Sequence, residues 1–413
     1  MAANIHHSSG PSTPITSTPT GITGTVKPEL INKIEGGSDE VLDAKLIPGQ
    51  DAIITISQDR SVRLWLLRDS GQYWPSICHY MNAAATAVVY HHPTRQLFVG
   101  TETGLVSEFI LGEDYNHMDH KRDYHAHQNR VSGLYFSSES KWILSISKDR
   151  HFQYHCTDSG RRVGGYLCPS WCTSLAYDEL AKYVFVGDYS GQITVLKLDQ
   201  PAVKLVNTLK GHTASVQTLF WEEQNGWLCS GSFDASVFVW DIAGRKGTVY
   251  ELHGHRQKVT ALAFSKERQV LLSGSEDNHL VLWNMATPRI ENPEWAQSDL
   301  CQLCSRPFFW NMRAMYEQKQ IGLRQHHCRK CGKAICNGCS TKRSTLPSRG
   351  HEFPVRVCEE CYIGITDDDK RSNTIFHDLK HSIKAMDMDL SRDLMITVGS
   401  DRIVKLWAIK NVL

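Results

Sequence analysis

The stretch KGHTASVQTLFWEEQNGWLCSGSFDASVFVWDI at residues 210–242 decides the fold, because residues 253–285 repeat it as HGHRQKVTALAFSKERQVLLSGSEDNHLVLWNM. The two segments align without a gap. Each contains a Gly-His pair, an alternating strand, a turn, a second strand with Ser-Gly-Ser, an Asp, and a strand that ends in Trp. An internal repeat of this length indicates an array of similar β units.

The Asp and the Trp recur six residues apart at four places: Asp59 with Trp65, Asp234 with Trp240, Asp277 with Trp283, and Asp401 with Trp407. Weaker copies end at Phe109, His155 and Leu196, so the first six copies end 41 to 46 residues apart. The seventh copy ends 124 residues after the sixth. A second, smaller domain is therefore expected between the sixth and seventh copies.

These repeats resemble the WD40 repeat, in which each copy contributes a four-stranded blade to a β-propeller. The resemblance implies a mainly β fold with seven blades: blades one to six and a closing strand in residues 25–291, and blade seven in residues 368–413. The run ELINKIEG, which begins at Glu29, is the candidate closing strand of the last blade. Closure of the ring would leave only short sheet edges.

The repeated His and Asp residues are expected to form a buried hydrogen-bonded network within each blade, and not a catalytic site. His212 and His255 are the clearest examples. Blades two and four carry Thr103 and Ser190 where the Asp would stand, so we expect these two blades to be less regular.

Eight of the thirteen cysteines form four Cys-x2-Cys pairs: Cys301 with Cys304, Cys328 with Cys331, Cys336 with Cys339, and Cys358 with Cys361. Two such pairs complete a closed tetrahedral site of four thiolates, so four pairs predict two structural zinc ions. The metal would fold a segment too small to bury an adequate core. The other five cysteines are expected to be small core or surface residues: Cys78, Cys156, Cys168, Cys172 and Cys229.

The residues around these pairs resemble the FYVE domain, a reader of phosphatidylinositol 3-phosphate. The resemblance is carried by RQHHCRKCG at residues 324–332, by RVC at residues 356–358, and by Trp295 upstream. It implies a cross-braced finger over residues 292–367. One zinc would be held by Cys301, Cys304, Cys336 and Cys339, and the other by Cys328, Cys331, Cys358 and Cys361.

The resemblance also assigns roles in headgroup binding. Arg324, Arg329 and Arg356 would contact the phosphates, which suits the donor fork of a guanidinium. His326 and His327 would donate to ring hydroxyls and phosphate. The family's Trp-x-x-Asp motif is displaced here, because Ser298 stands in the matching place and Asp299, the candidate for the inositol hydroxyls, is one residue late. Gln325 stands where the family usually has a basic residue.

The segment between the first two cysteine pairs contains 23 residues, which is longer than is usual in the family. Within it, Ile321 and Leu323 occupy the family's membrane-inserting loop. An apolar group precedes them: Phe308, Phe309, Trp310, Met312, Met315 and Tyr316. We expect this group to pack against the propeller, with a membrane-inserting wedge as the alternative.

The arrangement of both modules resembles the small WD-repeat and FYVE domain-containing proteins, which are endosomal adaptors. It implies a non-enzymatic scaffold of the cytosol and the early endosome. Its propeller would bind protein partners such as signalling kinases or trafficking proteins. The alternative is a RING-like ubiquitin ligase adaptor, since RING fingers share the two-zinc cross-brace.

Composition adds two exclusions. The net charge is +1 and no extended basic stripe is present, which argues against a nucleic-acid partner. No apolar run approaches the ~20 residues that cross a bilayer. Residues 1–24 are rich in Ser, Thr, Pro and Gly and are expected to be a disordered arm.

Overall fold

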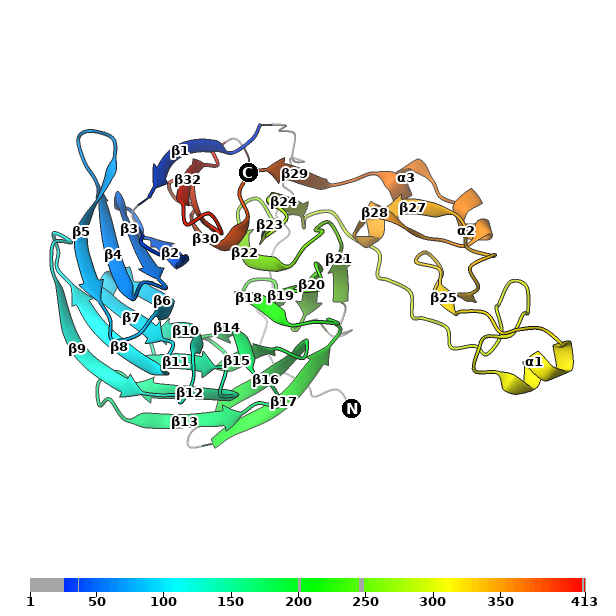
Figure 1. Cartoon of the computed structure of the whole chain (residues 1–413), viewed down its shortest axis with the longest axis horizontal. Coiled ribbons are helices and arrows are strands. Elements are labelled where there is room, and N and C mark those ends of the chain that lie inside the picture. Colours follow the sequence, from blue (N-terminus) through cyan, green and yellow to red (C-terminus); the bar gives the residue numbers. More distant parts are fainter. Residues whose placement is uncertain (1–25, 36, 200–201, 245–248, 411, 413) are drawn as a thin grey trace, which may run out of the picture.

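Seven four-stranded antiparallel sheets are arranged around a ring in the computed structural model, which describes residues 26–35, 37–199, 202–244, 249–410 and 412 (Figure 1). The arm expected at residues 1–24 lies outside the described residues. The ring confirms the seven-bladed β-propeller. In each blade the first strand lines the central channel and later strands lie progressively outward.

The first four blades follow the chain without interruption. Blade one contains β2 (Val41–Leu46), β3 (Ala52–Ser57), β4 (Ser61–Leu67) and β5 (Tyr73–Tyr80). Blade two contains β6 (Ala85–His91), β7 (Gln96–Thr101), β8 (Leu105–Leu111) and β9 (Met118–His125), with the short helix η1 (His92–Thr94). Blade three contains β10 (Val131–Ser137), β11 (Trp142–Ser147), β12 (His151–Cys156) and β13 (Arg162–Leu167). Blade four contains β14 (Cys172–Asp178), β15 (Tyr183–Asp188), β16 (Gln192–Asp199) and β17 (Ala202–Lys210).

Blade five also contains consecutive strands, whereas blades six and seven each take one strand from elsewhere in the sequence. Blade five contains β18 (Val216–Glu222), β19 (Trp227–Ser232), β20 (Val237–Asp241) and β21 (Val249–Leu252). Blade six contains β22 (Val259–Ser265), β23 (Val270–Ser275), β24 (His279–Asn284) and β29 (Thr374–Asp378). Blade seven contains β30 (Ile383–Asp389), β31 (Leu394–Gly399), β32 (Val404–Ala408) and β1 (Glu29–Ile34).

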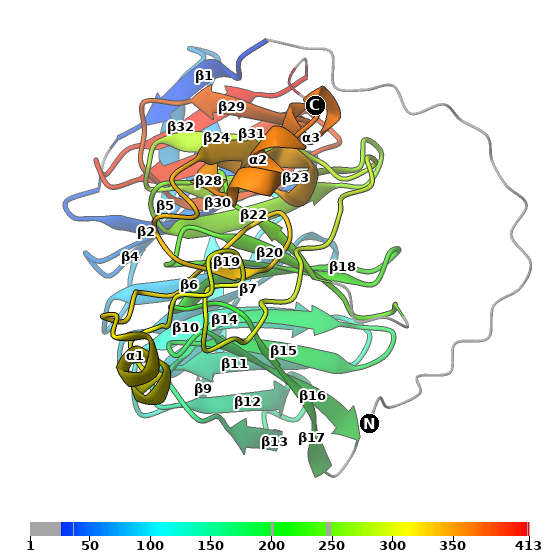
Figure 2. The same ribbon diagram turned by 90° about the vertical axis from the view of Figure 1, so that its right-hand side faces the viewer.

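Strand β1 closes the ring, as expected from the run that begins at Glu29. It pairs antiparallel with β32, and Leu30 lies opposite Trp407. The closing strand therefore joins the two ends of the described chain in one sheet (Figure 2).

The finger interrupts blade six, which corrects the predicted boundary. We expected it between blades six and seven, with all of residues 368–413 in blade seven. Instead β29 pairs with β24 and forms the outer strand of blade six. The repeat ends at the Trp of its third strand, so the sequence pattern could not show that the fourth strand follows the insertion.

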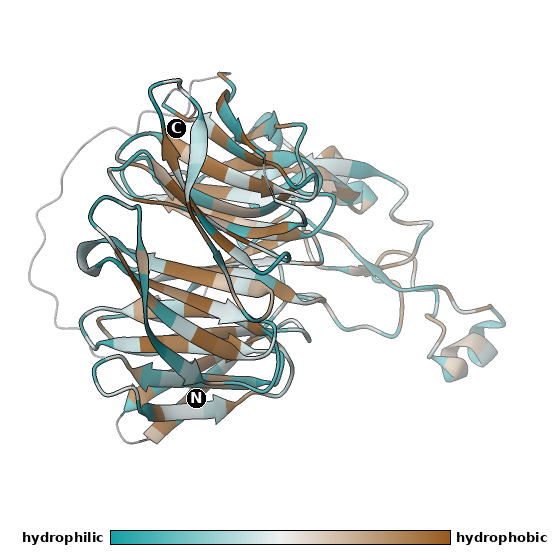
Figure 3. Ribbon diagram, turned by 60° about the vertical axis from the view of Figure 1, so that its left-hand side comes forward, coloured by the Kyte–Doolittle hydropathy of each residue, from teal (hydrophilic) through white to brown (hydrophobic). Residues whose placement is uncertain are grey.

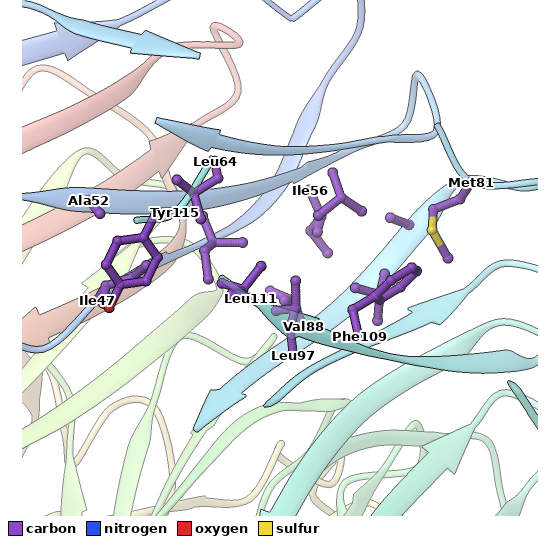
Figure 4. Packing of buried hydrophobic residues seen from close by; sticks show 14 residues of the cluster. Ile47, Ala52, Ile56, Leu64, Met81, Val88, Leu97, Phe109, Leu111 and Tyr115 are labelled. Carbon is purple, nitrogen blue, oxygen red and sulfur yellow. The ribbon is translucent and has the colours of Figure 1, made fainter. Parts of the chain in front are cut away.

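Apolar residues of adjacent blades interlock to form the core. Between blades one and two, Leu64 and Ile56 pack with Val88, Leu97 and Phe109 (Figure 4). Hydrophobic residues concentrate in the strands and hydrophilic ones in the connecting loops (Figure 3). This is the pattern of sheets that are covered on both faces.

A β-bulge recurs in the first strand of every blade, for example between Val259 and Ala261 in β22. Its extra residue carries a hydroxyl in several blades, and that hydroxyl donates to a carbonyl of the next blade. Thr260 Oγ1 lies 2.6 Å from Ile383 O, and Ser132 Oγ lies 2.6 Å from Cys172 O. The bulges thus link neighbouring blades around the channel.

The expected polar networks are present. In blade six, His255 Nδ1 lies 3.2 Å from a carboxylate oxygen of Asp277, and His255 Nε2 lies 2.7 Å from Ser273 Oγ. Trp283 Nε1 donates to the same hydroxyl at 2.9 Å. These contacts pair polar groups that are largely shielded from water, so the residues are structural.

Blades two and four keep the four strands and the same bulge, so the expectation that they would be less regular is wrong. In blade four Asp188 replaces the missing Asp. Its carboxylate accepts from the backbone and hydroxyl of Ser190, at 2.8 and 2.7 Å.

The finger contains short elements: α1 (Met312–Gln318), β25 (His326–His327), β26 (Ala334–Ile335), β27 (Arg343–Leu346), η2 (Pro347–Arg349), β28 (His351–Arg356), α2 (Glu359–Ile363) and α3 (Asp367–Lys370). It contacts the propeller where His253 and His351 form a parallel β-bridge with stacked rings. Helix α1 lies at the far end, away from the propeller (Figure 1).

Candidate metal centres and basic pocket

The eight paired cysteines gather into two groups of four. One contains Cys301, Cys304, Cys336 and Cys339, and the other contains Cys328, Cys331, Cys358 and Cys361. Within each group the sulfur atoms lie within 4.8 Å of one another. The pairs alternate along the chain, so the two groups interlock as the resemblance implies.

The sulfur geometry suits zinc. Cys304 Sγ lies 3.8 Å from Cys336 Sγ, and Cys331 Sγ lies 3.9 Å from Cys358 Sγ. A tetrahedron with Zn–S bonds of about 2.3 Å has S–S edges of about 3.8 Å. Backbone amides also point at the sulfurs, since Cys336 N and Cys358 N each lie 3.3 Å from a sulfur of their own group. The chain thus binds two structural zinc ions.

Little else holds the finger together. Its buried core consists of the innermost cysteines and five other residues: Phe308, Ala334, Ile335, Leu346 and Val357. A core of this size folds only with the metal. Removing zinc would therefore remove the support of every side chain described below.

A cavity of about 340 Å³ adjoins the second cysteine group, and its lining includes two arginines and two histidines but no carboxylate. It is lined by Trp295, Gln325, His326, His327, Arg329, Val355 and Arg356. Strand β25 supplies the histidines and the end of β28 supplies Arg356. Arg329 N donates to Arg356 O at 3.0 Å, which joins the two segments at the cavity floor.

Three of these side chains are held by neighbouring groups. His327 stacks on the Trp295 ring at 4.9 Å, and its Nε2 lies 3.1 Å from Ala296 O. The guanidinium of Arg329 also lies over the Trp295 ring, 4.6 Å from the ring centre. Arg356 donates to Ser340 Oγ at 2.7 Å and to Asn337 Oδ1 at 2.9 Å. The pocket is therefore preformed.

The cations at this site repel one another. Burial and the charges of Arg343 and Arg324 lower the pKa of Arg356. Burial and the charges of Arg356 and Arg324 lower the pKa of His326. Cations held together without an anion are the electrostatic signature of an anion site.

Arg343 belongs to this group, although the sequence analysis missed it. It lies on β27 directly opposite Arg356 in the register of the two strands. The sequence would have indicated that Arg343 and Arg356 are cross-strand neighbours only if the hairpin of β27 and β28 had been predicted.

Asp299 is not among the residues that line the cavity. Its carboxylate accepts from Trp310 Nε1 at 2.8 Å, and its carbonyl accepts from Phe308 N. The expected contact between Asp299 and inositol hydroxyls is therefore not supported by the geometry. Gln325 donates weakly to Ser298 O at 3.4 Å and stands at the cavity edge.

The membrane-loop candidates differ in exposure. Ile321 is 82% exposed, whereas Leu323 is half-buried against the core of the finger. The apolar group before them does not pack on the propeller, which overturns that expectation (Figure 1). Phe308 is buried within the finger, and Phe309, Trp310, Met312 and Tyr316 are exposed.

Among the described residues, no helix has the length and apolar character that crossing a membrane requires. A propeller joined to a two-zinc finger with a basic pocket defines the class: a WD-repeat protein that carries a phosphoinositide-binding type of finger.

Comparison with known proteins agrees. The FYVE zinc finger family matches residues 293–367, and the WD domain, G-beta repeat family matches residues 118–153, 203–241 and 246–284. The chain is 54% identical to WD repeat and FYVE domain-containing protein 1 of Homo sapiens over 92% of this chain and 93% of that protein. It is 51% identical to WD repeat and FYVE domain-containing protein 2 of Homo sapiens over 93% of this chain and 96% of that protein.

The chain therefore belongs to the WD repeat and FYVE domain-containing protein family. A structural comparison supports the fold alone. The WD40 β-propeller domain of Doa1 superposes with a TM-score of 0.60 at 16% identity, covering 92% of this chain and 96% of that one.

Proposed function

We propose that the protein is a non-enzymatic adaptor that binds phosphatidylinositol 3-phosphate on the cytosolic face of early endosomes and recruits proteins through its propeller. One observation carries the proposal: five cationic or imidazole groups converge on one pocket beside the second zinc site. Arg329, Arg356, His326 and His327 line the cavity, and no carboxylate is among its lining residues. Arg324 does not line it but lies close enough for its charge to lower the pKa of His326 and Arg356.

The pocket suits a phosphate monoester. Such a group carries nearly two negative charges and several acceptor oxygens, and paired guanidinium forks bind it with directional hydrogen bonds. Its charge would relieve the mutual repulsion of Arg356, Arg343 and Arg324. The phosphate would also raise the pKa of His326, so the imidazole would become a better donor in the complex.

The way in which the finger is joined to the propeller supports the proposed adaptor role. Both ends of the finger continue into strands of blade six, and the His253–His351 bridge adds a third connection. Docking of the finger would therefore fix the orientation of the ring and leave propeller surface free for partners. Endosomal signalling kinases and trafficking proteins are the partners that we propose.

The test is co-sedimentation of the zinc-loaded full chain with vesicles. The vesicles would contain phosphatidylinositol, one of its 3-, 4- or 5-monophosphates, or the 3,5-bisphosphate. Arg329→Ala is the test variant. Arg268→Ala is the matched control, because Arg268 is an exposed arginine on the turn between β22 and β23 of the propeller.

We expect selective binding to the 3-monophosphate, lost in Arg329→Ala by roughly tenfold or more and retained in Arg268→Ala. Equal binding to every phosphoinositide would contradict the proposed selectivity. If Arg329→Ala and Arg268→Ala bound the vesicles equally well, the pocket would not be the site that binds the headgroup.

A further inference from the structure

The segment between the first two cysteine pairs forms a separate lobe, which we call the insert lobe and define as residues 305–323. Phe308 anchors it in the zinc core and forms a parallel bridge with Leu323. Phe309 N donates to Leu323 O at 3.1 Å, and Leu323 N donates to Pro307 O at 2.9 Å. The lobe is thus an ordered part of the finger and not a loose loop.

The outer surface of the insert lobe is apolar and exposed. Tyr316 is 87% exposed and Met312 is 71% exposed, and they lie four residues apart on one face of α1. Phe309 and Trp310 are each more than half exposed. A contiguous exposed patch of large apolar side chains marks an interaction site.

Ile321 belongs to the same surface. The neighbouring Gly322 N lies 2.8 Å from Met315 Sδ of α1, and any Cβ at this glycine would lie 2.7 Å from Phe309 Cα. Only glycine allows the loop to approach the helix this closely. The close approach places Ile321 next to the exposed side of α1.

The charge around this patch is positive. Residues 305–324 contain Arg306, Arg313, Lys319 and Arg324 but a single acidic residue, Glu317. Glu317 is paired with Arg313 at 2.9 Å. Aromatic and apolar side chains surrounded by Lys and Arg are the composition of helices that lie in the interface of an anionic membrane.

The lobe is also continuous with the basic pocket. Trp310 is hydrogen-bonded to Asp299, and the neighbouring Ser298 accepts from Gln325, which lines the cavity. The propeller lies on the opposite side of the finger from α1 (Figure 1). A membrane that reaches the pocket can thus meet the lobe without obstruction from the ring.

We propose that the insert lobe is a second membrane-binding element, in which α1 lies in the interface of an anionic bilayer with Phe309, Met312 and Tyr316 among the lipid chains. Within the lobe, α1 and Phe309 are the new element, additional to the headgroup pocket and to the loop at Ile321 and Leu323 that the family resemblance already implies. The proposal rests on the proposed function, which brings the finger to a bilayer. It gives a single finger two attachments, which stable anchoring generally requires.

The test compares the full zinc-loaded chain with the double variant Met312→Ser/Tyr316→Ser. Both side chains point to solvent, so the variant leaves the core of the finger intact. Leu180→Ser is the matched control, because Leu180 is 70% exposed on the turn after β14 in the propeller. Affinity would be measured for phosphatidylcholine/phosphatidylserine vesicles with and without phosphatidylinositol 3-phosphate, and for the soluble headgroup inositol 1,3-bisphosphate.

We expect the double variant to lose about tenfold or more in affinity for both kinds of vesicle, as expected when two apolar side chains leave a bilayer. Its affinity for the soluble headgroup should equal that of the unmodified chain, and Leu180→Ser should behave as the unmodified chain throughout.

Unchanged vesicle binding by the double variant would overturn the proposal. If the same variant instead abolished self-association or capture of a protein, the lobe would be a protein-docking surface and the proposal would be wrong. Failure of the headgroup pocket gives a different result. The soluble headgroup would then bind neither the double variant nor the unmodified chain. The double variant would still bind phosphatidylserine vesicles more weakly than the unmodified chain.

Discussion

The most direct test of the blade network is the replacement of Ser273 by Ala. The hydroxyl of Ser273 is fully buried and joins two partners, because Trp283 Nε1 donates to it and His255 Nε2 lies 2.7 Å from it. With His255 Nδ1 directed at Asp277, the hydroxyl donates its own proton to Nε2. The substitution therefore leaves one buried donor and one buried acceptor without a partner.

Each buried polar group left without a partner costs about 1–3 kcal/mol, so the two groups freed by Ser273→Ala should lower the free energy of unfolding by about 2–6 kcal/mol. Blade one offers the comparison. There Trp65 Nε1 donates to Thr55 Oγ1 at 2.9 Å, and no histidine shares that hydroxyl in the described contacts. Thr55→Val leaves one group without a partner and should cost about 1–3 kcal/mol.

Urea unfolding followed by far-UV circular dichroism would measure both changes, with Ser70→Ala as a control at an exposed serine in blade one. We expect the transition midpoint to fall furthest for Ser273→Ala, less for Thr55→Val and not at all for Ser70→Ala. The reasoning is refuted if Ser273→Ala costs no more than Thr55→Val.

Three further predictions concern zinc, acid and the contacts between blades. Chelation of zinc should abolish headgroup binding, measured by a headgroup titration, while the strand signal of the propeller in circular dichroism persists. Loss of both headgroup binding and the strand signal would contradict a finger that folds on its own metal. Burial alone would raise the pKa of Asp277, but the hydrogen bond and charge of His255 lower it to about 2. The stability from Asp277 should therefore be complete above the unfolded pKa near ~3.9 and be lost as the pH falls toward 2, so Asp277→Asn should flatten the acid limb of a stability–pH curve. Thr260→Val should remove the hydroxyl contact with Ile383 O, cost about 1 kcal/mol, and speed amide exchange in β30 more than in β14.

The sequence was sufficient for the architecture because its signals are short-range. The Asp and Trp six residues apart mark the turn and third strand of a blade, and a nearly constant spacing between copies leaves little freedom in the count of blades. The cysteine pairs are equally local. Each pair supplies two sulfurs from one turn, so two zinc sites follow from four pairs.

What the sequence could not show depends on contacts between distant segments. Strand β29 is separated from its partner β24 by the whole finger, and the repeat pattern ends before the outer strand. Asp299 follows Trp295 one residue later than in the family motif, yet its carboxylate accepts a hydrogen bond from Trp310 and Asp299 does not line the cavity. Arg343 reaches the site only through its register opposite Arg356.

The apolar insert shows a different limit of sequence reading. Exposed Phe, Trp, Met and Tyr side chains are unfavourable in water, so packing on the propeller was the natural expectation. Composition alone does not say whether such a group is covered by another part of the same chain or by something outside it, such as a membrane. The three-dimensional placement of α1 away from the ring decides against the propeller (Figure 1).

The interruption of blade six has a consequence for how the protein is made. During synthesis, the third strand of this blade emerges from the ribosome about 90 residues before β29, a delay of roughly 5–18 s at 5–20 residues per second. The finger must therefore be completed, and can take up zinc, while one edge of blade six is still unpaired. Strand β1 waits longer still, because its partner β32 begins 370 residues after β1 ends (404 − 34). Zinc supply during translation would thus influence whether the ring closes correctly, even though all eight cysteine ligands lie outside the propeller strands.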